Sequence, residues 1–349
     1  MTDNIDLFVT NYNKNFTGVS ATTANVLIKQ TQIYNSRLVG YPLPDCPKPV
    51  SRTTAYSFAK VKPRNKPFSI WHVRRNNEMR DAIIARDILG LPIKIVFTSA
   101  AQRRHSLVPR WLISKMDTVI ATTKLAASYV PNVGAIIPHG VNTEKFTPSN
   151  NLREAWKKTG YPGVKGIATV GRIRKEKGTD LFVDSMIRVL PNMKDLTALV
   201  IGKAGDKDKS FLENLKSKVN TAGLNNRIIF TGEISAEKIP SIFRSLSLLV
   251  ALPRYEGYGM TPLEGMASGV PFVASNTGYF NEFSDQGRCG KVVPIEDLSS
   301  AVDCINLFLT EEAYRSKASI RSRTAADETY SISNEVELIS DVYKQLWSV

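Results

Sequence analysis

The sequence has few of the side chains that build disulfide frameworks and zinc sites. Its 349 residues include three histidines and three cysteines, and the cysteines lie apart at Cys46, Cys289 and Cys304. This excludes a disulfide-stapled fold and a cysteine-based zinc site. No apolar run approaches the roughly eighteen residues of a membrane span. The first residues are acidic, unlike those of a signal peptide. We therefore expect a cytoplasmic protein.

Acidic residues are scarce in the first part of the chain. Residues 1–150 hold 20 Lys and Arg against 8 Asp and Glu, whereas the remainder holds 26 against 24. Charges that served only solubility would be spread along the whole chain. The excess of Lys and Arg in residues 1–150 therefore indicates an anionic partner. Nucleic acid, an acidic membrane surface and a charged acceptor all fit this sign.

Alternating apolar strands and helices predict two α/β domains, at residues 1–147 and 148–332. This alternation is typical of parallel, doubly wound sheets, which bind ligands at the carboxyl ends of their strands. The proline-rich segment 41–68 predicts irregular loop and short strand. The expected strands are residues 5–9, 68–73, 93–98, 118–121, 135–138, 166–170, 197–201, 227–231, 248–252 and 271–274.

Residues 256–270 combine two carboxylates with a glycine-rich loop. Glu256 and Glu264 stand eight residues apart, after an apolar run typical of a buried strand. Thr261 is predicted to cap a helix that begins at Pro262. A strand, a loop and a helix start aim backbone N–H groups at an anion. A carboxylate beside an anion site needs a neutral partner such as a hydroxyl, so the segment indicates a nucleotide-sugar.

Two simpler interpretations of these carboxylates stay open. Thr261 and Glu264 have the spacing of a capping box, in which Glu264 accepts from the Thr261 backbone N–H. Glu256 alone could be a solvated loop charge. Only the complete string shifts the balance toward a ligand site.

From Glu256, that string reads Glu-Gly-Tyr-Gly-Met-x3-Glu-Gly-x-Ala-x-Gly-x-Pro, and it resembles the donor-site motif of glycosyltransferase family 4. The loop 171–178 is similar to the family's Gly-Arg-x4-Lys-Gly, and residues 137–142 resemble Ile-Pro-Asn-Gly-Val-Asp. The likeness covers residues 130–349. It implies a retaining enzyme of the GT-B fold, in which two doubly wound, Rossmann-like α/β domains face a cleft. A last helix, within residues 333–349, would pack back on the N-terminal, acceptor-side domain.

The resemblance also implies roles for individual residues. Arg172 and Lys177 would hold the donor diphosphate, and Glu256 the transferred sugar, so these three would be the catalytic residues. Glu264 would hold the ribose. Backbone and loop positions complete the expected donor site, at Gly18, Gly257, Gly259, Met260 and Thr261.

No metal or cofactor is expected besides the nucleotide-sugar donor. Two cations at the diphosphate can neutralise the leaving group without a metal. Asp206 and Asp208 spell the Asp-x-Asp of metal-dependent transferases. Because they lie among lysines rather than directly after an apolar strand, the pattern predicts a hydrated loop.

Basic clusters near strand ends of the first domain are expected to bind the acceptor, because arginine forks suit carboxylates and phosphates. The string Trp-His-x-Arg-Arg-Asn-Asn-Glu-Met from Trp71 resembles the family 4 mannosyltransferases of the bacterial lipopolysaccharide core. That implies GDP-mannose as donor and the anionic Kdo of a lipid A inner core as acceptor. The protein would be peripheral, held by charge at the inner leaflet. The expected acceptor-binding residues are His72, Arg74, Arg75, Arg103, Arg104 and His105.

The histidines depart from the family pattern. Many relatives place a histidine near the position of Thr98, and this sequence does not, so we assign no catalytic histidine or nucleophile. His139 stands where the family has asparagine, which indicates a role in a turn.

These observations predict a retaining hexosyltransferase that moves mannose from GDP-mannose to a Kdo–lipid A acceptor. One alternative is a UDP-sugar-dependent transferase for another cell-envelope glycan. Another is a non-catalytic basic protein that binds nucleic acid or acidic membranes. Binding alone has no use for Glu256, and the basic clusters lack the interleaved aromatics of a single-strand binder. No nucleic-acid partner is therefore expected.

Overall fold

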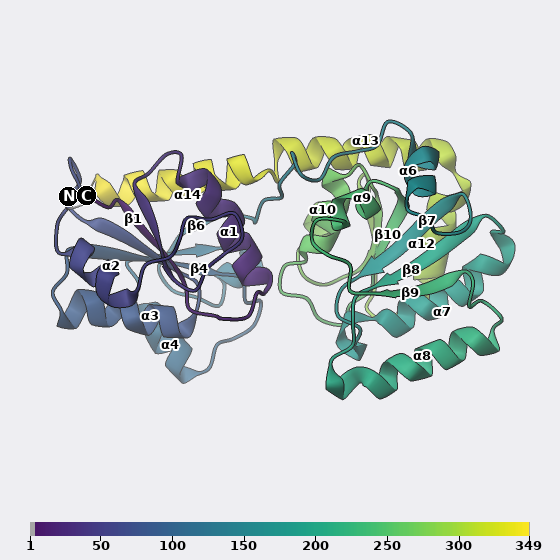
Figure 1. The fold of residues 1–349 in the computed structure, drawn as a ribbon, viewed down its shortest axis with the longest axis horizontal. Helices are drawn as coiled ribbons and strands as arrows, with labels where there is room; N and C mark the ends of the chain where they lie inside the picture. The colour runs from purple at the N-terminus through teal and green to yellow at the C-terminus, as the bar shows by residue number, and fades with distance from the viewer. Residues whose placement is uncertain (1–3, 349) are drawn as a thin grey trace. The chain divides into compact units, whose positions relative to one another are not determined.

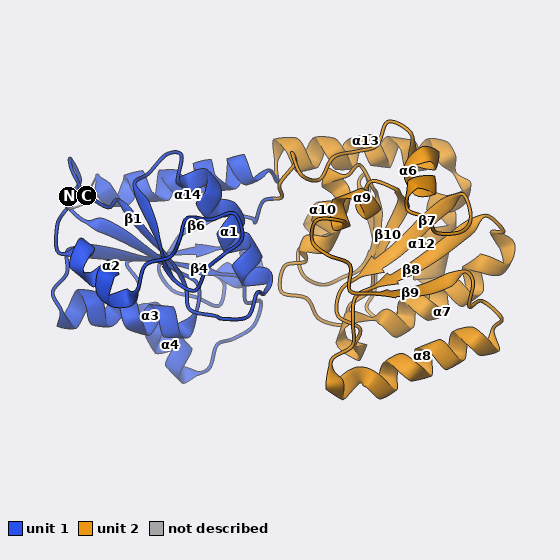
Figure 2. Ribbon diagram, in the orientation of Figure 1, with its two compact units in different colours: residues 1–140, 330–349 blue, residues 141–329 orange. Residues whose placement is uncertain are grey.

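The chain folds into two compact units, seen in a computed structural model that describes residues 4–348 (Figure 1). Unit 1 ends at Gly140 and resumes at Tyr330, and unit 2 is Val141–Thr329 (Figure 2). These limits lie beside the boundaries predicted after residues 147 and 332. Each unit holds one six-stranded sheet in which the strand pairs are parallel. The predicted pair of doubly wound α/β domains is confirmed.

Unit 1 is a sheet in the order β2-β1-β3-β4-β5-β6, covered on both faces. Alternate residues of one strand face opposite layers: Leu7 and Val9 pack with α1 and α14, whereas Phe8 packs with α2, α3 and α4. Burial on both faces explains why the central strands have apolar residues at consecutive positions. The elements are β1 (Leu7–Asn11), α1 (Gly18–Gln30), β2 (Ser36–Gly40), α2 (Arg52–Ala59), β3 (Ser69–Val73), α3 (Asn76–Ile83), β4 (Ile93–Ser99), α4 (Leu107–Ser114), β5 (Thr118–Ala121), α5 (Lys124–Ala127), β6 (Val133–Ile136) and α14 (Ile332–Trp347).

Unit 2 repeats the design in the order β12-β11-β10-β7-β8-β9. Its largest core lies where α7, α8 and α12 pack on one face of the sheet, around Ile167, Val200 and Leu248. The elements are α6 (Leu152–Lys158), β7 (Lys165–Val170), α7 (Thr179–Val189), β8 (Leu196–Ile201), α8 (Lys209–Thr221), β9 (Ile228–Gly232), α9 (Ile239–Phe243), β10 (Leu246–Ala251), α10 (Met260–Ala267), β11 (Phe272–Ser275), α11 (Phe280–Phe283), β12 (Gly290–Val293), α12 (Leu298–Thr310) and α13 (Glu312–Glu328).

The last helix, α14, belongs to unit 1 although it follows unit 2 in the chain. Val336, Ile339 and Tyr343 are buried against α1 and the strands. The Glu335 carboxylate accepts from the backbone N–H of Gly140 at 2.7 Å and lies 2.8 Å from the Nδ1 of His139. His139 therefore ties the turn after β6 to α14.

Three elements differ from the sequence predictions. The segment 41–68 was expected to lack helix, but it contains α2, whose N-cap Ser51 side chain accepts from the Thr54 N–H at 3.1 Å. The strands β2 and β12 were not predicted. Both lie at sheet edges, where one side of the strand has no neighbour and the apolar run is correspondingly short.

Candidate active site

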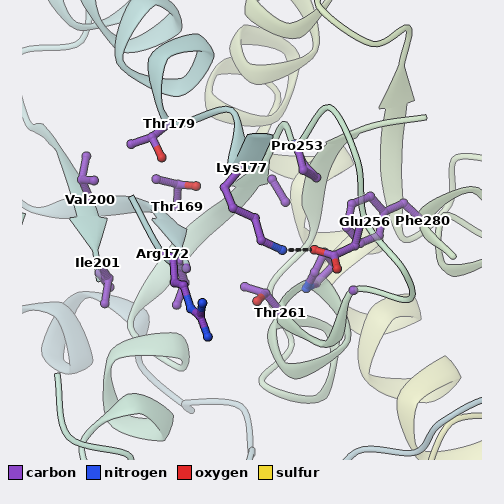
Figure 3. A pocket seen from close by; sticks show the side chains of 15 residues that line it. Thr169, Arg172, Lys177, Thr179, Val200, Ile201, Pro253, Glu256, Thr261 and Phe280 are labelled. Atoms are coloured by element: carbon purple, nitrogen blue, oxygen red, sulfur yellow. Dashed lines mark hydrogen bonds and ion pairs between the residues drawn. The ribbon is translucent and has the colours of Figure 1, made fainter. Parts of the chain in front are cut away.

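A pocket opens in unit 2 at the carboxyl ends of β7, β8 and β10, beside the first residues of α7 and α10 (Figure 3). This is where a doubly wound sheet binds ligands. Of the predicted donor residues, the structure brings five together here: Arg172, Lys177, Glu256, Gly259 and Thr261. The pocket therefore joins the loop after β7 with the segment after β10, which are far apart in sequence.

Two glycines shape the pocket because no side chain fits at either position. Gly178 has φ +67°, and a Cβ there would lie 1.7 Å from the carbonyl oxygen of Leu252. Gly259 has φ +97°, and its Cβ would lie 2.0 Å from the ring of Phe280. Both conformations favour glycine. The close approach at Gly178 presses the loop of Lys177 against the end of β10.

Helix α10 begins earlier than the sequence predicted. Its first residue is Met260 and its N-cap is Gly259, which makes no side-chain capping bond. The prediction of Thr261 as cap, with Pro262 at the first helical position, is therefore wrong, and so is the capping box of Thr261 and Glu264. The reason is backbone conformation: the left-handed Gly259 turns the chain into the helix directly. The first turn of α10 consequently begins at the pocket, which Gly259 and Thr261 line, and a helix start favours an anion.

Lys177 and Glu256 form an ion pair in the pocket, with 2.5 Å between Nζ and Oε2 (Figure 3). The other carboxylate oxygen of Glu256 accepts from the Gly257 N–H at 3.1 Å, and the Glu256 N–H donates to the Thr277 hydroxyl at 3.1 Å. The family resemblance implied a diphosphate as the ligand of Lys177 and a sugar as the ligand of Glu256. The structure shows them in direct contact, so a ligand for either group must adjoin the other.

Arg172 is exposed and forms no ion pair with any described residue. In Figure 3 its side chain lies at the pocket, on the β7 and β8 side, across from Glu256. The site thus offers one neutralised lysine, one uncompensated arginine and a helix start. The arginine and the helix start favour negative charge in the ligand.

Arg254 is a site residue that the sequence reading missed. Its guanidinium donates to both carboxylate oxygens of Asp180 at 2.9 Å, to Glu296 at 2.6 Å and to the carbonyl of Lys175 at 2.5 Å. It therefore fixes the turn that carries Lys177. The available signal was an arginine placed between a buried strand and Glu256.

Glu264 lies on α10 but does not line the pocket. Burial raises the pKa of its carboxyl group from 4.5 to about 7, and the charge of Lys145 opposes this rise. No described residue donates a hydrogen bond to this carboxyl group. A partner whose hydroxyl groups donate hydrogen bonds to this carboxyl group would stabilise its ionised form.

The other predicted donor residues, and the Asp-x-Asp pair of Asp206 and Asp208, do not line the pocket. Gly18 begins α1 in unit 1, and Gly257 lies next to Glu256 without lining the pocket. Asp206 and Asp208 form a short turn whose Asp206 carboxylate pairs with Lys209 at 2.8 Å. Over residues 4–348, no three His, Cys, Asp or Glu side chains are grouped so as to hold a metal ion.

In unit 1, His72 is fully buried in β3. Its ring nitrogens lie 2.5 Å from the hydroxyl of Tyr343 and 2.7 Å from that of Thr98. Burial lowers the pKa of the His72 ring well below 6.5, so the ring is neutral. These contacts bind α14 to the sheet, and they leave neither nitrogen free for an acceptor. Thr98 serves this network.

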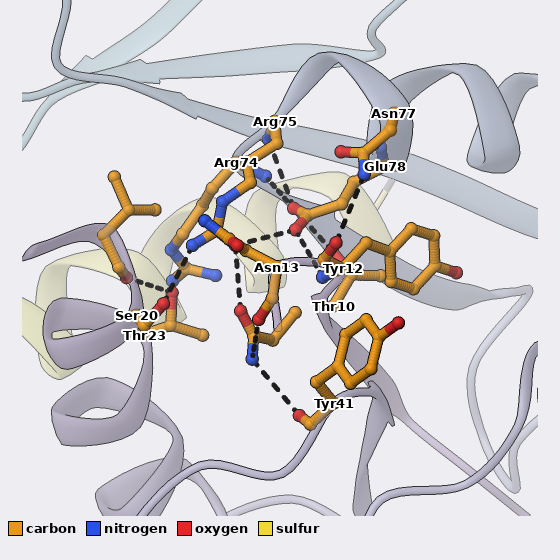
Figure 4. Close-up of polar contacts among 12 residues, drawn as sticks. Thr10, Tyr12, Asn13, Ser20, Thr23, Tyr41, Arg74, Arg75, Asn77 and Glu78 are labelled. Carbon is orange, nitrogen blue, oxygen red and sulfur yellow. Dashed lines mark hydrogen bonds and ion pairs between the residues drawn. The ribbon is translucent and has the colours of Figure 1, made fainter. Parts of the chain in front are cut away.

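Glu78 organises the loops after β1 and β3 (Figure 4). Its buried carboxylate accepts from the Thr10 hydroxyl at 2.9 Å, from the Tyr12 N–H at 3.0 Å and from the Arg74 N–H at 2.8 Å. The Arg75 side chain donates to Glu78 at 2.9 Å and to the Ser20 hydroxyl on α1 at 3.0 Å. Arg75 is thus a structural clamp between α1 and α3.

Arg74 differs from its neighbour. Its Nη1 is buried and has no hydrogen-bond partner among the described residues. Burial lowers the pKa of its guanidinium, whereas Tyr343, Glu335 and Glu78 oppose that shift. Of the predicted acceptor residues, Arg74 shares this property with His105, whose Nε2 is also buried without a hydrogen-bond partner among the described residues. Arg103, Arg104 and His105 lie in the loop before α4, with both arginines exposed.

The comparisons with known proteins agree with this architecture. The profile described as "Glycosyl transferases group 1" matches residues 153–325. The chain is 37% identical to "Lipopolysaccharide core biosynthesis mannosyltransferase LpsB" of Rhizobium meliloti, over 98% of each chain. It is 35% identical to the similarly named LpcC of Rhizobium leguminosarum bv. viciae, over 98% of this chain and 97% of that one.

Solved structures show the same fold. Anabaena HepE, crystallised with UDP, superposes with a TM-score of 0.83 at 14% identity, covering 98% of this chain and all of that one. The C-terminal domain of the group 1 glycosyl transferase LpcC from Francisella tularensis matches 55% of this chain with a TM-score of 0.54 and 34% identity.

The fold and the full-length relatives define a glycosyltransferase with the GT-B fold. More particularly, the chain belongs to the group 1 glycosyl transferases, as the resemblance of the motif at Glu256 predicted. Among the described residues, no helix is both long and apolar enough to cross a membrane.

Proposed function

We propose that this enzyme transfers mannose from GDP-mannose, with retention of configuration, to the Kdo region of a lipopolysaccharide inner core. The observation that carries the proposal is the pocket that holds Arg172, Lys177 and Glu256 at the start of α10. The mannosyl group and the lipopolysaccharide acceptor are supported by the names of the two full-length rhizobial relatives.

In this proposal, the cations of the pocket stabilise the leaving diphosphate. Arg172, Lys177 and the N–H groups at the start of α10 supply charge and donors where negative charge develops as the glycosidic bond breaks. Glu256 receives a hydroxyl of the transferred sugar. Because Lys177 already contacts Glu256, a bound donor places sugar and diphosphate on either side of one ion pair. No metal is needed to neutralise the diphosphate.

The acceptor side of the proposal rests on unit 1. The unpartnered Nη1 of Arg74 can donate to a carboxylate of Kdo, and the exposed Arg103 and Arg104 add positive potential. Arg75 and His72 support this region without binding the acceptor, because their polar atoms are engaged with protein groups. An acceptor with a lipid tail would hold the enzyme at the inner leaflet.

The direct test is transfer by the purified protein with Kdo–lipid A as acceptor and a panel of GDP- and UDP-sugars. We expect a product one mannose heavier with GDP-mannose, formed equally in excess EDTA. Mass spectrometry detects the product, and NMR gives its anomeric configuration. Transfer only from a UDP-sugar would overturn the donor assignment, and loss of activity in EDTA would overturn metal independence.

Glu256→Gln tests the pocket itself. We expect kcat to fall by about 10²–10³, the usual loss when one group that stabilises the transition state is removed. The affinity for GDP, measured by calorimetry, should not fall, because GDP lacks the sugar and the change leaves Lys177 without its counter-charge. Glu176→Gln is the matched control, since Glu176 is exposed in the neighbouring loop and does not line the pocket. Full activity of Glu256→Gln would contradict the proposal that Glu256 receives a hydroxyl of the transferred sugar.

A further inference from the structure

Helix α4 in unit 1 exposes apolar side chains on the face that points to solvent. Leu107, Val108 and Trp111 are 80%, 68% and 56% exposed. The opposite side of the helix already packs in the core through Leu112 and Ile113, which are buried. An ordinary surface helix has polar residues on its outer face. Three large apolar side chains gathered within two turns therefore indicate a surface that is covered when the protein works.

The charges around this face are all of one sign. Arg103 and Arg104 precede α4, Arg110 lies within it, and Lys115 follows it with its Nζ 5.9 Å from the centre of the Trp111 ring. All four are exposed. Between Asp87 and Glu144 the sequence has a single acidic residue, Asp117.

That one acid does not offset the cations at α4. The Asp117 carboxylate accepts from Arg86 at 2.7 Å and from Lys94 at 2.9 Å, so its charge is already neutralised. A shallow groove continues the apolar surface from α4 across Tyr129 and Pro131. An apolar strip with an exposed tryptophan and a border of uncompensated arginines matches the interface of an anionic bilayer, with rings at the head-group level and cations on the phosphates.

We propose that α4, with Arg103, Arg104, Arg110 and Lys115, is the surface by which unit 1 inserts into an anionic lipid bilayer. This α4 face is distinct from the pocket of unit 2. The inference deepens the proposed function, since a lipid-linked acceptor would be presented at the same surface. It does not depend on which sugar is transferred, because vesicle binding is measured without donor or acceptor.

The experiment is flotation of the full chain with vesicles of phosphatidylethanolamine and phosphatidylglycerol, compared with phosphatidylcholine alone. We expect binding to the anionic vesicles, and about tenfold or greater weakening on neutral ones. The triple variant Leu107→Ser, Val108→Ser, Trp111→Ser should lose binding to a similar extent, and so should Arg103→Ser, Arg104→Ser, Arg110→Ser. Trp111→Ser alone should weaken it in part.

Matched controls exist in unit 2. Ile320→Ser removes an apolar side chain that is 67% exposed on α13, and Lys207→Ser removes an exposed cation. Both should bind vesicles like the parent chain. All variants should unfold at the parent temperature, because the changed side chains are exposed.

Tryptophan fluorescence gives an independent readout. Trp71 and Trp156 are buried and Trp347 is half-buried, so Trp111 is the tryptophan most exposed to solvent. Its emission should shift to the blue on binding anionic vesicles, and Trp111→Phe should abolish the shift while binding persists. With an acceptor lacking lipid tails, the apolar triple variant should keep the parent rate.

Three results would overturn the proposal. One is parent-like vesicle binding by the apolar triple variant. Another is vesicle binding without a fluorescence shift. The third is a parent dimer, seen by ultracentrifugation, that the triple variant dissociates while neither chain binds vesicles, since a second copy would then cover α4. None of these results affects the transfer assay, so failure here is distinguishable from failure of the proposed transferase function.

Discussion

Individual residues near the pocket fall into groups that line it and groups that hold others in place. Lys177 and Glu256 neutralise each other, Arg172 has no counter-charge, and Arg254 fixes the turn beneath Lys177. The motif pointed to Glu256 and the two cations. It could not reveal Arg254, because that residue acts through the Lys175 carbonyl and two carboxylates that are brought near it only by folding.

Arg172→Ala tests whether the free cation holds the diphosphate. We expect GDP affinity to fall about 10- to 100-fold, the equivalent of one charged hydrogen bond. Calorimetric titration with GDP measures this. The control is Lys175→Ala, which removes a cation from the same loop without changing the pocket lining. Equal affinities in Arg172→Ala and the parent would show that the diphosphate binds elsewhere.

The buried carboxyl group of Glu264 makes stability depend on pH. Its pKa is raised from 4.5 to about 7, so the folded state favours the neutral acid and is weakened as the group ionises with rising pH. Glu264→Gln should therefore equal the parent below pH 4.5. The variant should become more stable between pH 4.5 and 7, and hold an advantage of about 1–3 kcal/mol above pH 7.

Denaturant unfolding across this pH range measures the difference, and guanosine diphosphate is omitted so that binding does not contribute. A constant difference at all pH values would contradict the raised pKa. A parent that is more stable than the variant at pH 8 would show that folding lowers the pKa of Glu264 instead of raising it.

At the scale of elements, the central strands of each sheet could be predicted from the sequence, whereas the edge strands β2 and β12 could not. Buried central strands such as β8 and β10 are apolar except for one hydroxyl residue each, a pattern that a sequence displays directly. The edge strands β2 and β12 contain glycine and a cation among few apolar residues. Helix α2 was missed because the prolines around it dominate the local pattern. The start of α10 depended on the left-handed conformation of Gly259, which residue types alone do not fix.

Gly259→Ala tests that start of α10. An alanine would need φ +97° and would place its Cβ 2.0 Å from the Phe280 ring. We expect a loss of about 2–3 kcal/mol in unfolding free energy, with weaker GDP binding because the first turn shifts. The double variant Gly259→Ala, Phe280→Ala should relieve the overlap but not the backbone strain. Unchanged stability of the single variant would contradict the role given to this glycine.

At the scale of the whole molecule, the two units differ in how the chain completes them. Unit 2 is one continuous segment, whereas unit 1 needs α14 from the far end of the chain. That connection was expected only through the family resemblance, because nothing local in residues 333–349 specifies which sheet they cover.

Separate expression of the units tests this difference. Residues 141–329 should unfold cooperatively alone and bind GDP, in keeping with the isolated C-terminal domain crystallised from Francisella tularensis. Residues 1–140 should not fold without 330–349, because the apolar side of β1 and β3 facing α14 would be exposed to water. Circular dichroism during heating measures both. A cooperative transition in the fragment 1–140 would contradict the role of α14.

Unit 1 is formed by two separate segments of the chain, and this sets the order in which its parts are synthesised. Residues 330–349 leave the ribosome only after all of unit 2 has emerged. The second unit can therefore reach its native structure while the first waits with one face of its sheet uncovered. A nascent chain of this protein consequently exposes that face throughout translation, and it is during this interval that a chaperone would protect it from aggregation.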